Sequence, residues 1–322
     1  MKNTILKSFF LVCILTIAIA GPYFSYINKK PYSSLDKIFL EKGFSNLQSI
    51  KTIQDELSYL DNIFLKIFLK LNNNPYQAGE YNIYNKSLVD IHNIFINGDI
   101  VTYELKIIPG MNIYDINSLI DKTSLINDCI NLKCINNSFN FKEGTIFPNT
   151  YFYKKGMMAS DLLKPISNDL EEFILEIFQK KPSNNPINNI EQALILASII
   201  EKEAGTENEK DLIASVFLKR LAIGMKLQAD PTIIYGLLPN FNGDIKKSDI
   251  RDANNKFNTY VINGLPPTPI SIVNKKSIKA AIMNVPGEYL YFVANNNGDH
   301  YFSKTYNEHL EAVKLYQLKW WK

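Results

Sequence analysis

The N-terminal segment contains a long stretch without a charged side chain, and this stretch limits where the rest of the chain can fold. Residues Phe9–Ala20 are almost all apolar, and the uncharged run continues to Ile27 between flanking lysines. A helix needs about 20 residues to cross the hydrocarbon core of a bilayer. Residues 9–27 therefore predict a transmembrane anchor. The alternative is a cleaved signal peptide, because Ala18–Ala20 has the small-residue form of a cleavage site.

Both interpretations export the remaining chain. With an anchor, residues 1–8 form a cytoplasmic tail, and we expect a single-pass protein of the inner (cytoplasmic) membrane. The bulk of the chain would then lie on the periplasmic or extracellular side. In such an oxidising space Cys129 and Cys134 either form a disulfide or remain two isolated thiols.

The composition excludes several classes of function. Lys and Arg total 35 against 32 Asp and Glu, and the resulting net charge of +3 is too balanced for a nucleic-acid-binding protein that neutralises phosphates. Three cysteines and three histidines leave little material for a metal site, so we expect no metal and no cofactor. A hydrophobic fraction of 46% over 322 residues is typical of a globular protein of about two domains.

The exported part divides into four segments that together indicate an α+β fold. Residues 28–75 predict a helical connector, because their apolar residues recur at helical spacing. Residues 76–122 predict a small strand–helix–strand module that is similar to the sugar-binding LysM module. The polar residues 123–140 form a linker. Residues 141–322 form a larger mixed α+β domain.

The clearest local signals lie in the second and fourth of these segments. Strands are expected at 79–83 and 100–108, with a helix at 88–95 between them. Near the C-terminus, alternating residues at 289–294 and 300–303 flank a turn of Asn, Gly and Asp, which is typical of a β-hairpin.

Four blocks of the larger domain contain candidate site residues. The first block runs from Glu143 to Tyr153 and interleaves aromatic rings with one carboxylate and a proline. Such a surface suits stacking against the CH faces of sugars, with Glu143, Phe147 and Tyr151 as candidates. The alternative is a packing loop rich in aromatic residues.

The second block, Leu196–Gly205, is an apolar helix that runs into two glutamates. Helical geometry places both Glu201 and Glu203 on faces shared with apolar residues. A carboxyl group at the mouth of a buried helix is partly desolvated, which raises its pKa and suits a general acid. The alternative is that the glutamates belong to a solvated last turn.

The third and fourth blocks supply hydrogen-bonding residues in turns that proline makes rigid. Such residues suit a polyhydroxylated substrate, although a capped turn and a structural loop are the alternatives. The candidates are Arg220, Gln228, Asp230, Thr232 and Tyr235 in the third block, and Asn258 and Tyr260 in the fourth.

The blocks ASIIEKEAG, LQADPTIIYG, NTYVINGLPP and YLYFVANNNGDHYFSKTYNEH occur in this order. Together they resemble the membrane-anchored endolytic murein transglycosylase family, also called YceG-like proteins. The resemblance implies an enzyme that cuts peptidoglycan strands internally between N-acetylmuramic acid and N-acetylglucosamine and leaves 1,6-anhydro ends. Such an enzyme terminates or trims nascent strands, so cell-wall synthases (penicillin-binding proteins) are the implied protein partners. The family's catalytic glutamate corresponds to Glu203.

Two other functions remain open at this point. A membrane-anchored peptidoglycan-binding scaffold without catalysis also fits the module and the anchor. A glycoside hydrolase would need a second carboxylate, for which Glu143 and Asp230 are the candidates. A lytic transglycosylase does not need one, because the 6-hydroxyl of the sugar is its internal nucleophile.

Overall fold

The computed structural model describes residues 2–54 and 56–318, and the side chains of residues 14, 16–54 and 56–317. The chain divides into two compact units. The N-terminal unit contains residues 1–103 and 152–155, and the C-terminal unit contains residues 104–151 and 156–322. The division falls inside the segment 76–122, whose extent as a separate module stays a prediction.

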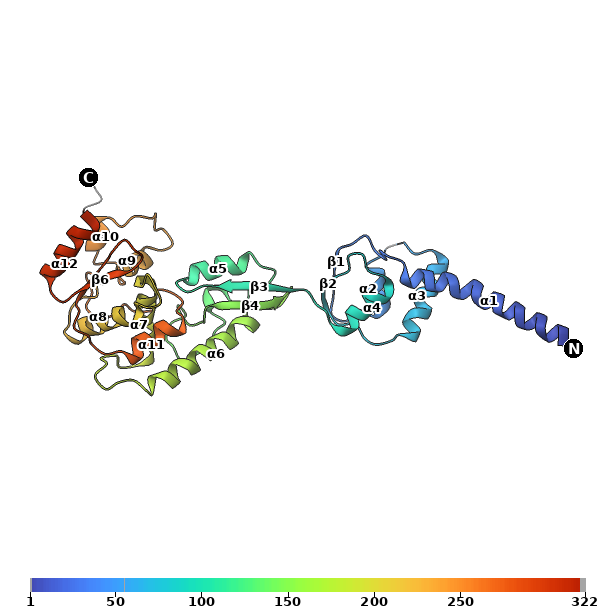
Figure 1. Cartoon of the computed structure of the whole chain (residues 1–322), viewed down its shortest axis with the longest axis horizontal. Helices are drawn as coiled ribbons and strands as arrows, with labels where there is room; N and C mark the ends of the chain where they lie inside the picture. The colour runs from blue at the N-terminus through green and yellow to red at the C-terminus, as the bar shows by residue number, and fades with distance from the viewer. Residues whose placement is uncertain (1, 55, 319–322) are drawn as a thin grey trace. The chain divides into compact units, whose positions relative to one another are not determined.

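The N-terminal unit packs four helices around a short two-stranded sheet (Figure 1). Its strands β1 and β2 pair antiparallel, with Ile38 opposite Tyr81. The core lies between this sheet and the helices, where Leu65, Tyr81 and Phe95 are fully buried. The elements are α1 (Lys2–Asn28), β1 (Lys37–Leu40), α2 (Asn46–Lys51), α3 (Tyr59–Leu71), β2 (Gly79–Asn82) and α4 (Leu88–Asn97).

The prediction of a transmembrane anchor at residues 9–27 is wrong. None of the helices in the described part of the chain is long and apolar enough to span a membrane. The last turns of α1 pack against protein instead: Ile27 is buried, and the rings of Tyr23 and Tyr26 lie against Phe64 of α3.

The predicted single-pass location in the inner membrane is overturned with the anchor. The separate tail at residues 1–8 stays a prediction. Residue 1 and the side chains of residues 2–13 and 15 lie outside the described residues. The α+β character of the chain, by contrast, is confirmed by the helices and the three two-stranded sheets that its described residues form.

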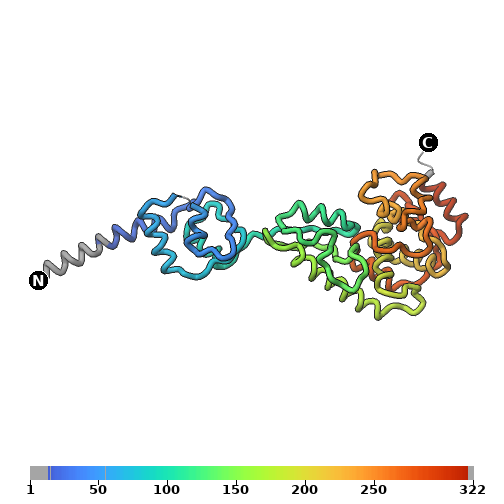
Figure 2. The backbone as a smooth tube through the Cα atoms, turned by 180° about the vertical axis from the view of Figure 1, so that it is seen from behind, coloured from blue at the N-terminus to red at the C-terminus, as the bar shows by residue number. Residues whose placement is uncertain are grey.

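The C-terminal unit contains most of the helices. Strands β3 and β4 pair with each other and are divided between the units, because residues 102–103 of β3 and 152–154 of β4 belong to the N-terminal unit. In Figures 1 and 2 the two strands run between α5 and α6. The predicted C-terminal hairpin is confirmed as β5 and β6, which pair antiparallel with Tyr291 opposite Ser303. The strands are β3 (Thr102–Ile107), β4 (Asn149–Lys154), β5 (Tyr291–Ala294) and β6 (His300–Ser303). The helices are α5 (Ile113–Asp121), the short helix η1 (Ile130–Leu132), α6 (Ala159–Phe178), α7 (Ile190–Glu203), α8 (Lys210–Ala222), α9 (Asp230–Leu237), α10 (Lys247–Arg251), α11 (Lys275–Met283), α12 (Tyr306–Val313) and the π-helix η2 (Lys314–Leu318).

Helix α7 is the centre of this unit. All residues from Ala193 to Ile200 are buried, because α6, α8, α9 and α11 pack around the helix. The side chain of Asn189 caps its first turn by accepting a hydrogen bond from the backbone N–H of Gln192. The buried part of the helix ends at Ile200, directly before Glu201 and less than one turn before Glu203, so the two glutamates lie at the edge of the core.

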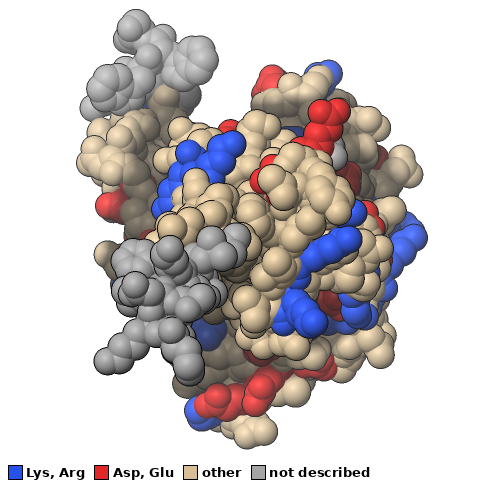
Figure 3. Space-filling model, turned by 90° about the vertical axis from the view of Figure 1, so that its right-hand side faces the viewer, with Lys and Arg blue, Asp and Glu red and all other residues tan. Residues whose placement is uncertain are grey.

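Charged side chains of both signs share the molecular surface. On the face drawn in Figure 3, Lys and Arg side chains alternate with Asp and Glu side chains. This distribution agrees with the small net charge of the chain.

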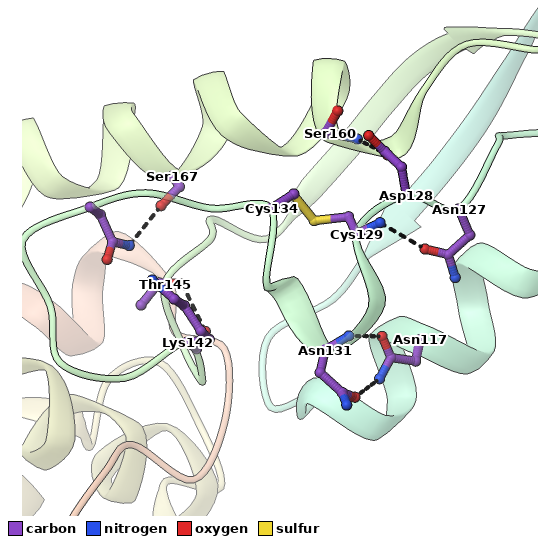
Figure 4. The surroundings of a disulfide bond; sticks show 11 residues. Asn117, Asn127, Asp128, Cys129, Asn131, Cys134, Lys142, Thr145, Ser160 and Ser167 are labelled. Atoms are coloured by element: carbon purple, nitrogen blue, oxygen red, sulfur yellow. Dashed lines mark hydrogen bonds between the residues drawn. A yellow bond between two sulfur atoms is a disulfide. The ribbon is translucent and has the colours of Figure 1, made fainter.

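A disulfide joins Cys129 and Cys134 and closes the short loop that contains η1 (Figure 4). The loop is held from both sides: the Asn131 N–H donates to Asn117 of α5 over 2.8 Å, and the Ser160 N–H of α6 donates to Asp128 over 2.9 Å. Residues 123–140 are therefore attached to both helices through side-chain contacts.

Candidate functional site

A cavity of about 520 Å³ opens in the C-terminal unit at the last turn of α7. Its wall comes from the ends of α7 and α8, the start of α9, the β5–β6 hairpin, α12 and η2. Five of the predicted site residues line it: Glu203, Arg220, Gln228, Asp230 and Tyr260. The other lining residues are Tyr291, Phe292, Val293, Ala294, His300, Tyr306, His309, Val313 and Gln317.

Glu203 is the last residue of α7 and faces this cavity. Burial and, to a smaller extent, the negative charge of Asp230 raise its pKa to about 8, while Arg220 opposes both effects. No residue in the described ranges donates a hydrogen bond to its carboxyl group. The carboxylate oxygens at the end of a helix also face its negative pole, which favours the neutral acid. Glu203 is therefore mostly protonated at neutral pH.

Glu201 lies only two residues earlier but in a different environment. Its carboxylate accepts a hydrogen bond from the Ser277 hydroxyl over 2.6 Å and from the Asn274 N–H over 3.1 Å, both at the start of α11. It also pairs with Lys210 of α8 over 3.0 Å, and both side chains are nearly inaccessible to solvent. Glu201 thus connects α7 to α8 and α11, and it has no position on the cavity wall.

Arg220 lies on the cavity wall and is held by backbone carbonyl groups. Its Nε donates to Leu290 O over 2.8 Å, and a terminal nitrogen donates to Leu227 O. The guanidinium group lies 5.6 Å from the centre of the Tyr291 ring. Burial lowers the pKa of Arg220 from its ordinary value. Its charge remains close enough to moderate the pKa of Glu203.

Three polar residues form the side of the cavity next to α9. Gln228 is exposed and has a φ of 49°, which is an uncommon left-handed conformation for a residue other than glycine. Asp230 begins α9, so its carboxylate lies at the positive pole of that helix. The Tyr260 hydroxyl donates to this carboxylate over 2.6 Å.

Thr232 and Asn258 support this side from within the protein. Both are fully buried, and neither lines the cavity. Thr232 shares a hydrogen bond of 2.9 Å with Thr259, which fixes the start of α9 to the segment carrying Tyr260. Asn258 donates to three carbonyl oxygens at the end of α10 and accepts the Tyr260 N–H over 3.0 Å.

Glu143 and Tyr235 contact each other away from the cavity. The Tyr235 hydroxyl donates to the Glu143 carboxyl group over 2.9 Å, and the backbone N–H groups of Ile113 and Gly144 donate to the same group over 2.9 and 3.1 Å. Burial raises the pKa of Glu143 to about 7, although these three donors oppose the effect. The geometry gives this pair a structural role between α5 and α9.

Phe147 and Tyr151 line a second cavity of about 670 Å³, between β4, α6 and the start of α11. Phe147 packs edge-on against Phe173, and the Lys275 ammonium lies 5.2 Å from the centre of its ring. The Tyr151 hydroxyl donates to the Phe147 carbonyl oxygen over 2.9 Å. The structure therefore separates these two aromatic candidates from Glu203.

The sequence reasoning missed the C-terminal wall of the first cavity. Tyr291 and His300 come from the hairpin, and Tyr306 and His309 come from α12. The ring of His309 stacks on that of Tyr291 at 5.2 Å, and burial lowers its pKa. The available signal was the block of aromatic residues and histidines around the hairpin, which contains two of the three histidines in the chain.

No group of three or more His, Cys, Asp or Glu side chains is arranged to hold a metal ion among the described residues. The polar groups on the cavity wall are acids, amides, phenols, imidazoles and the guanidinium of Arg220, which suit hydrogen bonding to a polar ligand.

Known proteins resemble this chain over different lengths. An endolytic murein transglycosylase of Bacillus subtilis (strain 168) is 33% identical over 175 residues, which cover 54% of this chain and 48% of the relative. An endolytic murein transglycosylase of Streptococcus pneumoniae serotype 2 is 28% identical over 172 residues, covering 52% of this chain and 31% of the relative. The matched segment thus spans half or less of the length of these curated relatives.

A longer match comes from a solved structure. The crystal structure of a YceG-like protein from Listeria monocytogenes aligns with a TM-score of 0.51 and 27% identity, covering 88% of this chain and 99% of that chain. The model of the YceG-like family matches residues 40–315, which is most of the sequence. The chain therefore belongs to the YceG-like family.

Proposed function

We propose that this protein is an endolytic murein lytic transglycosylase with Glu203 as its acid. The single observation that carries the proposal is the carboxyl group of Glu203, which faces a cavity of about 520 Å³ with a pKa of about 8 and no hydrogen-bond donor among the described residues. The names of the relatives from B. subtilis and S. pneumoniae support the same activity.

The reaction follows from the protonation state of this group. Protonated Glu203 donates its proton to the glycosidic oxygen between N-acetylmuramic acid and N-acetylglucosamine as the bond breaks. The 6-hydroxyl of the muramic acid attacks its own anomeric carbon and forms the 1,6-anhydro ring. The hydroxyl proton leaves to a base as the anhydro ring closes. General acid–base catalysis of this kind contributes about 10²–10⁴-fold to the rate.

The rest of the wall supplies contacts for a glycan. The rings of Tyr260, Tyr291 and Tyr306 offer faces for sugar stacking, while Gln228 and Asp230 offer hydrogen bonds to hydroxyl and acetamido groups. Phe147 and Tyr151, in the second cavity, would contact a more distant part of the same strand. We propose cell-wall synthases as the partners that supply nascent strands.

The test is digestion of purified peptidoglycan by the full chain, with mass spectrometry of the released fragments. We expect wild type to produce 1,6-anhydro ends and Glu203→Gln to produce them about 10²–10⁴-fold more slowly. Glu288→Gln is the matched control, because its carboxylate is on the surface in an ion pair with Lys304. An unchanged yield of anhydro ends from Glu203→Gln would contradict the proposal.

The same assay separates the alternatives. Reducing ends in place of anhydro ends would indicate a hydrolase, for which Asp230 is the second carboxylate on the cavity wall. Strands that bind but stay intact would indicate a scaffold.

A further inference from the structure

His300 is held by a carboxylate that does not itself line the cavity. Both oxygens of Glu209 contact the histidine: one accepts its backbone N–H, and the other lies 3.1 Å from its ring Nδ1. Both side chains are mostly buried, with 14% of His300 and 9% of Glu209 exposed. Two contacts from one carboxylate fix the backbone and the ring of His300 together.

The turn that precedes His300 is attached to the segment that follows Glu203. A side chain at Gly205 would collide with the carbonyl oxygen of Gly298, so the two backbones lie in direct contact. The Thr206 hydroxyl also donates to Asp299 over 3.3 Å. These contacts and the Glu209 pair hold the hairpin against the loop between α7 and α8. Glu203 and His300 are thereby kept on the wall of one cavity.

The Glu209 contact decides which ring nitrogen of His300 remains available. A carboxylate can only accept, so Nδ1 carries the hydrogen in this pair. In the neutral imidazole, Nε2 is then the acceptor. No hydrogen bond joins Nε2 to any residue of the described ranges. In hydrolases with a Ser-His-Asp triad, a carboxylate likewise binds Nδ1–H of the histidine and leaves Nε2 free to act as the base.

We propose that His300, oriented by Glu209, is the base that removes the proton of the attacking 6-hydroxyl while Glu203 protonates the leaving oxygen. This inference rests on the proposed function. The bond between the 6-oxygen and the anomeric carbon forms, and the glycosidic bond breaks. The hydroxyl proton moves to Nε2 of His300, and the Glu203 proton moves to the leaving oxygen. Solvent then returns a proton from His300 to Glu203.

The other polar groups of the cavity suit this step less well. Asp230 already accepts the Tyr260 hydroxyl over 2.6 Å, so one of its oxygens is occupied by a donor of the protein. His309 has no carboxylate partner among the described residues: its ring stacks on Tyr291, and none of these residues forms a hydrogen bond with its buried Nδ1. His300 alone among these groups combines an orienting carboxylate with an acceptor nitrogen.

The test compares initial rates of anhydro-end formation by the full chain and its variants on purified peptidoglycan. For His300→Ala we expect a loss of at least about 10²-fold with retained glycan binding, and partial recovery when imidazole is added to the buffer. Glu203→Gln should not recover with imidazole, because it lacks the acid. Glu311→Gln, an exposed carboxylate on α12, is the matched control with unchanged activity.

Glu209→Gln tests the same proposal with the histidine in place. The amide oxygen must still accept the His300 backbone N–H, so the amide N–H₂ group faces Nδ1 and imposes the other tautomer. Nε2 then carries a hydrogen and cannot act as a base, so we expect a loss similar to that of His300→Ala. Circular dichroism checks that both variants are folded.

Two results would overturn the inference. One is a rate in His300→Ala or Glu209→Gln within about twofold of wild type. The other is a loss in folded His300→Ala that imidazole does not change, which would make the residue purely structural. Both differ from failure of the proposed function, in which wild type forms no anhydro ends or Glu203→Gln forms them normally.

Discussion

Glu203→Gln should make the C-terminal unit more stable at neutral pH, although it removes the proposed acid. The folded protein holds this carboxyl group at a pKa of about 8, against an ordinary value of 4.5. Unfolding hydrates the group and lets it ionise. The folded state therefore binds more protons than the unfolded state between these two values, and stability falls as the pH rises through that range. Glutamine cannot ionise, so the variant avoids this loss.

The magnitude follows from the interval between the two pKa values. Wild-type folding stability changes by about 1.4 kcal/mol per pH unit in this range. Relative to acid pH, the free energy of unfolding is therefore lower by about 3 kcal/mol at pH 7 and by about 5 kcal/mol above pH 8. Solvent reaches part of the Glu203 side chain and partly hydrates its charged form, so the actual loss of stability is smaller. We therefore expect the variant to gain about 1–3 kcal/mol at pH 7 and close to nothing near pH 4.

The measurement is urea unfolding followed by circular dichroism at several pH values between about 4 and 8.5. Glu201→Gln is the matched control two residues away. It removes one partner of the buried pair with Lys210, so it should lower stability at neutral pH by about 3–5 kcal/mol. A gain for Glu203→Gln that does not vary with pH, or a loss at pH 7, would refute the assignment of a desolvated carboxyl group.

Three further outcomes are expected. Anhydro-end formation should fall as the pH rises through about 8, because ionised Glu203 has no proton to donate; a rate that still rises above that pH argues against this acid. Gly205→Ala should cost about 1–3 kcal/mol and reduce turnover by displacing the hairpin from Gly298, as urea unfolding and the digestion assay can show. Tyr235→Phe removes one donor to the buried Glu143 carboxyl group and should cost about 1–3 kcal/mol of stability with an unchanged KM for peptidoglycan. A raised KM in that variant would instead favour direct contact with substrate.

Local patterns predicted the parts of the fold that depend on nearby residues. The apolar run that ends at Glu203 gave α7, and the alternating segments around a turn gave the β5–β6 hairpin. Strand β1 was missed because it is only four residues long and is fixed by pairing with β2, about 40 residues away.

The candidate site was predicted only in part, because its geometry also depends on contacts between residues far apart in the sequence. Helical periodicity could not separate Glu201 from Glu203, because the difference comes from Ser277 of α11, 76 residues away. The contact between Glu209 and His300 spans 91 residues and leaves no local pattern. The anchor prediction failed because periodicity cannot show that the last turns of α1 pack on α3.

The residues that line the first cavity are spread along the sequence, and their order decides when the proposed site is complete during synthesis. Glu203 is translated well before the hairpin, α12 and Gln317, which supply more than half of the lining residues. A nascent chain that stops before Tyr291 lacks this part of the cavity wall, including His300. The proposed glycan-cutting site would thus stay incomplete until the ribosome has added the C-terminal elements.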